Sequence, residues 1–343
     1  MILIRMDVSV IIPTRNRSAF LALTLRSVLR QRAVDLEVIV IDEASSDDTL
    51  SVIASFDDPR IRVIRHETPR GVSTARNHGI AAAATDWIAF LDDDDLWAPD
   101  KLALQLQAAR GSGASWVYVG HVHIDIRNRV TAGVPPLAPE RLIEQLPEFN
   151  AVPGGCSGVM VSKRALTVAG GFNTELQPLA DWDLWLRLAR VGRPEWVPSP
   201  LVGYRLHGEQ MSLNASRIQR EFWMLSSREG GTPNPALLYR YLGWCALRVR
   251  NHRVAVRFFV RAWFYRRQGF AYQALASDLS ALATDILSHR LRIRLPRRKS
   301  SRRVPEEHRK WRSEAQAWVD ELVAAANAGH QPRETLGMGV DKV

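Results

Sequence analysis

The sequence feature that most constrains the fold is a run of four aspartates, 92–95, framed by apolar residues. The segment 87–91 (WIAFL) precedes it, and Leu96 and Trp97 follow it. An apolar run of this length predicts a buried strand that ends in a cluster of negative charge. Adjacent carboxylates repel one another unless a cation offsets them, and oxygen ligands favour Mg²⁺ or Mn²⁺. The alternative is a surface loop in which the aspartates act as turn and helix-cap residues.

The N-terminal part alternates between two kinds of apolar pattern. Runs that fit buried strands lie at 8–12, 36–41, 61–65 and 87–91. Helical spacing lies between them, at 20–29, 49–56 and 71–84. This alternation predicts a parallel α/β sheet with both faces covered, and such sheets bind ligands at the carboxyl ends of their strands. We therefore expect three polar groups to converge there: Thr14 with Arg15, Asp42 with Glu43, and the aspartates 92–95.

Charge divides the chain into two parts. Residues 1–216 carry 22 basic and 25 acidic side chains, whereas 217–343 carry 24 and 11. The second part also has helical spacing, so we expect an α/β domain over 1–216 and a basic helical extension over 217–343. There is no Gly-rich dinucleotide or P-loop motif, which argues against both kinds of nucleotide site.

The N-terminal sequence and the cysteines bear on the expected compartment. The N-terminal segment is too short for a signal peptide, and no apolar run reaches the ~20 residues that a membrane span needs. The two cysteines, Cys156 and Cys245, provide neither a disulfide framework nor metal-ligand spacing. We expect a cytoplasmic protein, or one peripheral to the inner face of the cell membrane.

Three single residues are candidates for chemistry, each with a plainer alternative. Asp181, on a predicted helix at 179–189, is either a general base or an N-cap. His207, after a predicted strand at 196–203, is either a metal or phosphate ligand or a structural histidine. Arg76 either contacts a diphosphate or base or is an ordinary surface arginine.

Two basic stretches are candidates for an interaction surface. The stretch 247–268 holds seven arginines and no acid, interleaved with aromatic residues, and 290–310 holds ten basic residues. Arginine with aromatic side chains favours contact with an anionic membrane. A protein partner or plain solvated surface is the next alternative, and nucleic acid is the least favoured.

Five segments, taken in order, resemble family 2 glycosyltransferases of the GT-A fold over about 8–213. They are VSVIIPTRNR, VIVIDEASSDDT, RGVSTARNHGIAAAATDWIAFLDDDD, GGFNTELQPLADWDLWLRLA and YRLHGEQMS. The resemblance implies a GT-A nucleotide-diphospho-sugar transferase fold, with a mainly parallel Rossmann-like sheet. It also implies a metal-dependent, inverting enzyme that uses a nucleotide-sugar, with a UDP-sugar expected first.

The resemblance also assigns roles to residues. It implies that the nucleotide-sugar is bound by Pro13, Thr14, Arg15, Asp42, Glu43, Arg76, Asp92 and Asp93. It implies Asp94 and His207 as ligands of Mg²⁺ or Mn²⁺, and Asp181 as the catalytic base. Two departures are Glu43, where the family usually has a second Asp, and Ala180, where it commonly has Glu.

The expected function is transfer of one sugar to a hydroxyl of a glycan or lipid-linked acceptor, in polysaccharide or cell-envelope glycan synthesis. Single addition is expected because the segment 219–223 lacks the Arg of the processive enzymes' Q-x-x-R-W motif. One alternative is a nucleotidyltransferase, which the absence of glycine from the loop PTRNRS disfavours. The other is an inactive membrane-associated scaffold, which the intact Asp92, Asp94 and Asp181 disfavour.

Overall fold

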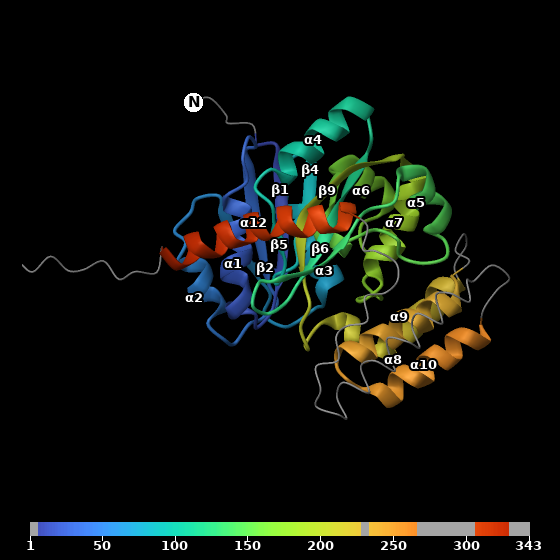
Figure 1. Ribbon diagram of the computed structural model, residues 1–343. Helices are drawn as coiled ribbons and strands as arrows, with labels where there is room; N and C mark the ends of the chain where they lie inside the picture. The colour runs from blue at the N-terminus through green and yellow to red at the C-terminus, as the bar shows by residue number, and fades with distance from the viewer. Residues whose placement is uncertain (1–5, 228–232, 266–305, 329–343) are drawn as a thin grey trace, which may run out of the picture.

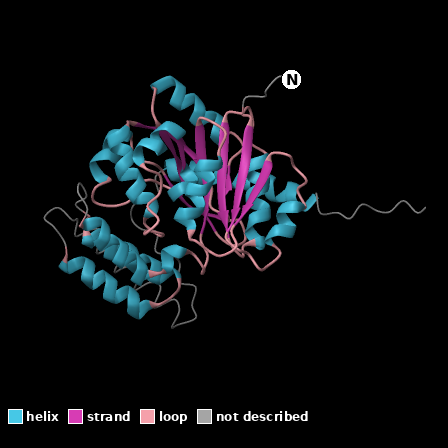
Figure 2. Cartoon of the chain, turned by 180° about the vertical axis from the view of Figure 1, so that it is seen from behind, coloured by secondary structure: helices cyan, strands magenta, loops and turns pink. Residues whose placement is uncertain are grey.

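The computed structural model describes residues 6–227, 233–265 and 306–328. Helices cover both faces of one mixed sheet, and a group of helices lies beside it (Figure 1, Figure 2). The strands are β1 (Val8–Thr14), β2 (Leu36–Asp42), β3 (Ile61–Arg65), β4 (Trp87–Phe90), β5 (Leu96–Trp97), β6 (Trp116–Ile124), β7 (Val130–Val134), β8 (Val159–Ser162) and β9 (Pro194–Arg205). The longer N-terminal helices are α1 (Ser18–Leu29), α2 (Thr49–Ala54), α3 (Val72–Ala82) and α4 (Lys101–Ser112). They are followed by α5 (Pro139–Gln145), α6 (Lys163–Ala169), α7 (Ala180–Val191), α8 (Ala215–Ser226), α9 (Pro235–Arg248), α10 (His252–Phe264) and α12 (Glu306–Ala328).

The sheet has a parallel half and a mixed half. Its order is β3-β2-β1-β4-β8-β6-β9-β5, and β7 pairs with β6. The first four strands run parallel, as the sequence predicted, but β8 is antiparallel to both of its neighbours. The mixed half comes from the segment whose sequence shows short, irregular apolar runs, so its strand directions could not be predicted.

The parallel strands are apolar throughout because both of their faces are covered. On β1 and β2, Ile11 and Ile39 belong to the core on the α7 side. Val10 and Val38, one residue earlier, belong to the core under α1 and α4. The alternation of faces along a strand therefore places successive side chains in two different cores.

The helices after β9 add to these cores. Buried residues of α8, α9 and α10, among them Phe222, Leu242 and Phe258, belong to the same apolar cluster as the sheet. Helices α9 and α10 pack against each other. In the portion of the chain that the structure describes, no helix has both the length and the apolar character needed to cross a membrane. The domain boundary at 216 stays a prediction.

Helix α12 returns to the sheet and covers its β6–β9 region (Figure 1). Its buried residues Ala315, Val319 and Leu322 recur at helical spacing and pack on Val122 and Ile124 of β6. Trp311 sits against Gly120, where an added Cβ would lie 2.2 Å from its ring. A glycine at this point of β6 therefore makes the space that Trp311 fills.

We predict that Trp311→Ala lowers the free energy of unfolding by about 3–5 kcal/mol, because it leaves a cavity where a buried indole packed. Trp223→Ala is the matched control, since Trp223 is 45% exposed and should change stability by only about 0.5 kcal/mol. Urea denaturation of both variants measures the difference. Equal effects would show that α12 contributes little to the stability of the sheet.

Candidate active site

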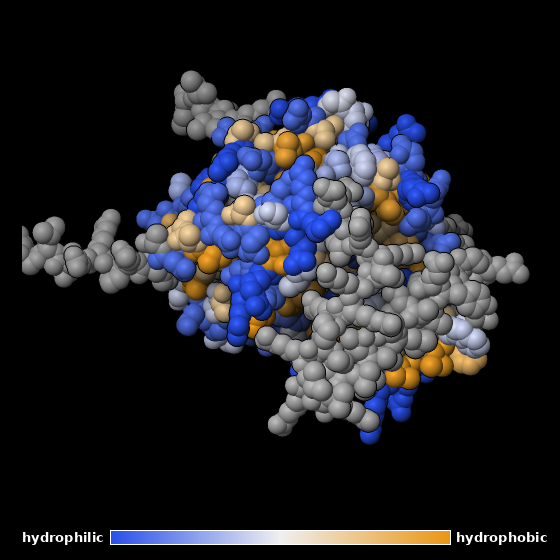
Figure 3. Space-filling model, in the orientation of Figure 1, coloured by the Kyte–Doolittle hydropathy of each residue, from blue (hydrophilic) through white to orange (hydrophobic). Residues whose placement is uncertain are grey.

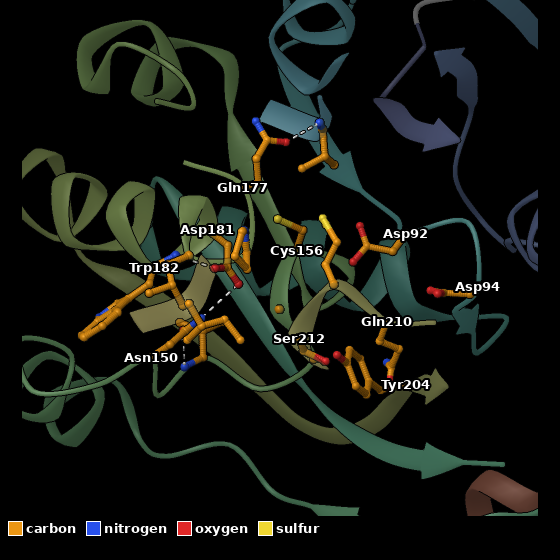
Figure 4. A pocket seen from close by; sticks show the side chains of 18 of the residues that line it. Asp92, Asp94, Asn150, Cys156, Gln177, Asp181, Trp182, Tyr204, Gln210 and Ser212 are labelled. Carbon is orange, nitrogen blue, oxygen red and sulfur yellow. Dashed lines mark hydrogen bonds between the residues drawn. The ribbon is translucent and has the colours of Figure 1, made fainter. Parts of the chain in front are cut away.

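A cavity of about 920 Å³ opens at the carboxyl ends of the parallel strands. The predicted site residues that line it are Pro13, Thr14, Arg15, Glu43, Arg76, Asp92, Asp93, Asp94 and Asp181. Asp181 and Asn150 lie on one side of it, with Asp92 and Asp94 on the other (Figure 4). The strand pattern predicted that residues of the three polar groups meet here, and the structure adds Asp181, about 170 residues away from Thr14 in the sequence.

The two acidic residues at the end of β2 lie behind and beside this cavity. Asp42 is fully buried; its Oδ1 accepts a hydrogen bond from the Ser45 N–H at 3.1 Å, and Arg65 Nε lies 3.3 Å from its Oδ2. Glu43 contacts His66 and accepts the backbone N–H groups of Arg70 and Gly71, each at 2.6 Å. Glu43 thus holds the loop after β3 and Asp42 the loop after β2, and their contact with a nucleobase stays a prediction.

The aspartate run does not form an open surface loop. Asp92 accepts a hydrogen bond from Arg76 Nη2 at 2.6 Å, and Asp94 contacts His207 Nε2 at 2.7 Å. Asp95 is fully buried and accepts hydrogen bonds from the Ser157 hydroxyl at 2.6 Å and the Arg205 backbone N–H at 2.9 Å. Each of these three carboxylates therefore has a fixed polar partner.

Arg205 fixes the backbone of the aspartate loop 92–95. Only 2% of it is exposed, and its guanidinium donates to the backbone carbonyls of Asp94 and Asp125 at 2.7 and 3.1 Å and to Asn128 Oδ1 at 2.8 Å. It also stacks over Phe20, 5.2 Å from the ring centre. An arginine can saturate several acceptors at once in this way because its donors are fixed in a plane.

Protonation also limits the charge of the loop. Burial and the neighbouring Asp94 carboxylate raise the pKa of both Asp93 and Asp95. A carboxyl group with a raised pKa holds its proton to higher pH, so the repulsion among the four aspartates is smaller than their number suggests. A cation is therefore not the only way in which the fold tolerates them.

Asp181 lies in the first turn of α7, and its helix-cap alternative does not hold, because the N-cap is Leu179. One of its carboxylate oxygens accepts the Asn150 amide at 3.0 Å and the other accepts the Trp182 N–H at 2.7 Å. Burial raises its pKa. A desolvated carboxylate held by two donors, with lone pairs left over on the cavity side, has the properties of a general base.

Arg76 is buried, so the surface-arginine alternative does not hold either. Only 4% of the residue is exposed, and its guanidinium lies 5.2 Å from the ring centre of Phe172. Its Nε is buried without a hydrogen-bond partner in the described part of the chain. An arginine with a spare donor beside a cavity can bind a phosphate oxygen.

The donor set suits a hard divalent cation at the aspartates, since carboxylate oxygens are the ligands that Mg²⁺ and Mn²⁺ prefer. Within the described ranges, no cluster of three or more His, Cys, Asp and Glu side chains forms a complete metal site. His207 Nδ1 accepts the Glu209 N–H at 3.2 Å, so its Nε2 carries the proton and donates to Asp94. In this arrangement His207 orients the Asp94 carboxylate, and its role as a ligand stays a prediction.

The structure adds residues that the sequence did not single out. Asn150 and Ser157 contact the key carboxylates, and each comes from an irregular segment with no periodic pattern. Helix α9 supplies a wall of the cavity with Tyr241, Trp244 and Arg248. The aromatic and basic composition of α9 was a usable signal, but nothing in the sequence showed that the extension folds back onto the cavity.

Comparison with known proteins agrees with this geometry. Residues 9–167 match the model of the family described as Glycosyl transferase family 2. Residues 9–167 therefore form a family 2 glycosyltransferase domain. The resemblance found in the sequence is therefore confirmed.

Two curated relatives are similar over most of this glycosyltransferase. The UDP-Glc:alpha-D-GlcNAc-diphosphoundecaprenol beta-1,3-glucosyltransferase WfgD of Escherichia coli is 26% identical over 249 residues, which cover 71% of this chain and 94% of that protein. An uncharacterized glycosyltransferase of Haemophilus influenzae is 29% identical over 212 residues, which cover 60% of this chain and 70% of that protein.

A solved structure confirms the GT-A fold. The mannosyltransferase PcManGT of Pyrobaculum calidifontis, solved in complex with GDP-Man and Mn²⁺, aligns with a TM-score of 0.51 and 19% identity. The alignment covers 96% of this chain and 89% of that one. At this identity the likeness concerns the fold alone.

Proposed function

We propose that this protein is an inverting glycosyltransferase that transfers a single sugar from a nucleotide-sugar to a hydroxyl of a glycan or lipid-linked acceptor. A UDP-sugar is the proposed donor. The observation that carries the proposal is the cavity itself, with Asp181 on one side and Asp92 and Asp94 on the other. The name of the E. coli relative, which includes UDP-Glc and a diphosphoundecaprenol-linked sugar, supports a role in polysaccharide or cell-envelope glycan synthesis.

Asp181 is the proposed catalytic base. It would accept the proton of the acceptor hydroxyl as the hydroxyl oxygen attacks the anomeric carbon of the donor sugar. Asn150 would keep one carboxylate oxygen in place, so the free lone pairs point into the cavity. Attack on the face opposite the leaving diphosphate gives inversion at the anomeric carbon.

The donor half of the cavity is proposed to bind the nucleotide diphosphate. Pro13, Thr14 and Arg15 would line the nucleoside part, with Asp42 and Glu43 nearest to the base, while Asp92 and Asp93 would face the ribose and sugar. Arg76, whose Nε is unsatisfied among the described residues, would donate to the diphosphate. Mg²⁺ or Mn²⁺, held by Asp94 and by His207 after a tautomer change, would offset the charge of the leaving diphosphate.

We predict that one nucleotide of the series UDP, GDP, dTDP and CMP raises the melting temperature of the protein, and raises it further with Mn²⁺. The shift follows from binding to the folded state alone. Differential scanning fluorimetry measures it, and Asp94→Asn should lose the Mn²⁺-dependent part. Absence of any shift with all four nucleotides would contradict the donor site and favour the scaffold alternative.

We predict that Asp181→Asn lowers kcat by roughly 10²–10⁴, the range for a general base, and leaves nucleotide binding unchanged. Because burial raises the Asp181 pKa, the acidic limb of the wild-type kcat/KM profile should lie above the ordinary value of about 3.9. Activity falls as the pH drops through that limb, because the protonated carboxyl cannot accept a proton.

The matched control for Asp181→Asn is Asp183→Asn. Asp183 lies on the same helix, but it pairs with Arg187 at 2.5 Å. This variant should keep kcat and its acidic limb while losing some stability. Full transfer by Asp181→Asn would eliminate the base assignment.

We also propose peripheral contact with an anionic membrane through the basic segment 247–310, at the inner face of the cell membrane. Its residues 266–305 lie outside the described structure, but α10 exposes Val256, Val260 and Phe264, the last 73% exposed. Hydrophobic residues gather over this helix in Figure 3. Arg253 and Arg257 of the same helix are exposed. Apolar residues flanked by arginines suit the interface of an anionic bilayer.

We predict that the protein sediments with vesicles containing phosphatidylglycerol, and that a Val260→Asp, Phe264→Asp double variant does so much less, because it removes the apolar anchor. Val168→Asp, at a valine on α6 that is 67% exposed, should sediment like the wild type. Equal binding by all three proteins, or by none, would argue against a membrane role for α10.

A further inference from the structure

A group of polar rings lies on the cavity wall away from the donor residues. His121 and His123 are two residues apart on β6, so both project from the same face of the strand. Tyr204 of β9 pairs with His123 in register. The three ring centres lie within 5.0–6.0 Å of one another. The opposite face of β6 is apolar and lies under α12, so the polar face is free to serve the cavity.

His121 has an unsatisfied polar atom in this group. The residue is 6% exposed, and its Nδ1 is buried without a hydrogen-bond partner in the part of the protein that the structure describes. A buried polar atom of this kind is costly for the fold unless a ligand or water satisfies it. His121 lines the cavity, so a turn of its ring toward the cavity would let a ligand supply the missing partner.

Arg248, at the end of α9, gives the group a positive charge. Burial and the Arg248 charge lower the pKa of His123 to about 4. Burial, His123 and Arg248 together lower the pKa of His121 well below its ordinary range. The carboxylates of Asp92 and Asp94 lie on the donor side of Tyr204, where Arg76 and His207 contact them. The two imidazoles are therefore neutral, so each can donate one ring N–H, and Arg248 is the cation that acts on both of them.

Two adjacent glycines link this group to the proposed base, because Gly154 lies against His121 and Gly155 lies against Asp181. A Cβ at Gly154 would lie 3.4 Å from His121 Cβ, and a Cβ at Gly155 would lie 3.4 Å from Asp181 Oδ2. Both glycines have positive φ, 71° and 53°, which lets the backbone turn tightly between the two side chains. An acceptor sugar whose hydroxyl meets Asp181 therefore has this group within its own length.

We propose that His121, His123 and Arg248 bind a phosphate group of the acceptor, so that the acceptor is a glycosyl phosphate or diphosphate ester rather than a neutral glycan. Two imidazole groups and a planar guanidinium match the three peripheral oxygens of a phosphate, and an arginine binds phosphate through two parallel donors. Tyr204 offers a flat face to the sugar. The proposal rests on Asp181 as the base of the reaction, but the anion site itself can be measured separately.

The first experiment measures the anion site without catalysis. Isothermal titration calorimetry of the UDP-saturated protein with phenyl phosphate should show binding that weakens about tenfold or more in Arg248→Gln and in His121→Gln, since each loses a hydrogen bond to a charged group. Arg127→Gln, at an exposed arginine outside the cavity, should bind like the wild type. Equal binding by all variants, or no binding by the wild type, overturns the proposal.

The second experiment asks which anion is the natural one. Benzoate replaces phenyl phosphate, and tighter binding of benzoate would assign the site to a carboxylate and overturn the phosphate. Transfer is then assayed with alkyl diphosphate esters of glucose, galactose and N-acetylglucosamine, and with the octyl glycosides of the same sugars. The diphosphate esters should be preferred, and Arg248→Gln should raise their KM about tenfold with the donor KM unchanged.

Together with the nucleotide-binding measurement, these experiments distinguish a failure of the proposed function from a failure of the acceptor phosphate site. If no nucleotide shifts the melting temperature, the proposed function fails whatever phenyl phosphate does. If a nucleotide binds and neutral glycosides are used as well as the diphosphate esters, the acceptor phosphate site fails while the glycosyltransferase stands. Arg248 lies at the exposed end of α9, so its variant tests the site even if His121→Gln does not fold.

Discussion

The acidic loop after β4 depends on a set of hydrogen bonds that hold its carboxylates apart, while burial raises the pKa of two of them, Asp93 and Asp95. Arg205 binds the loop's backbone, Ser157 binds Asp95, and Arg76 and His207 bind Asp92 and Asp94. These partners come from three separate segments, so the loop can form only when the end of β9, α3 and the turn before β8 are all in place. The geometry of the donor half of the cavity is thus a property of the whole sheet.

The parallel half of the fold could be predicted because each of its strands is identified by a short apolar run in the sequence. Apolar runs with covered faces identify β1, β2 and β4, and their shared direction brings residues such as Thr14 and Asp92 to one edge. The mixed half could not, because the antiparallel position of β8 depends on pairing between distant segments. Asn150 shows the same limit at the site, since only the fold places it against Asp181.

The basic helical extension also has a structural role that its net charge does not indicate. Its excess of arginines suggests a separate surface element, yet residues of α8, α9 and α10 complete the main core, and Arg248 reaches the cavity. Sequence composition reports the average of both faces of a helix, and it does not reveal which face another part of the chain will cover. The wall formed by α9 therefore became visible only in three dimensions.

The docking of α12 has a consequence for the order in which the molecule can assemble. Leu96, Val122 and Ile124 are buried together with this helix, whose residues follow every strand in the chain. During synthesis the sheet can pair its strands long before α12 exists, and in that interval this apolar face has no cover. A nascent chain would thus pass through a stage in which the sheet is paired but its apolar face is exposed. At that stage chaperone binding or aggregation competes with folding.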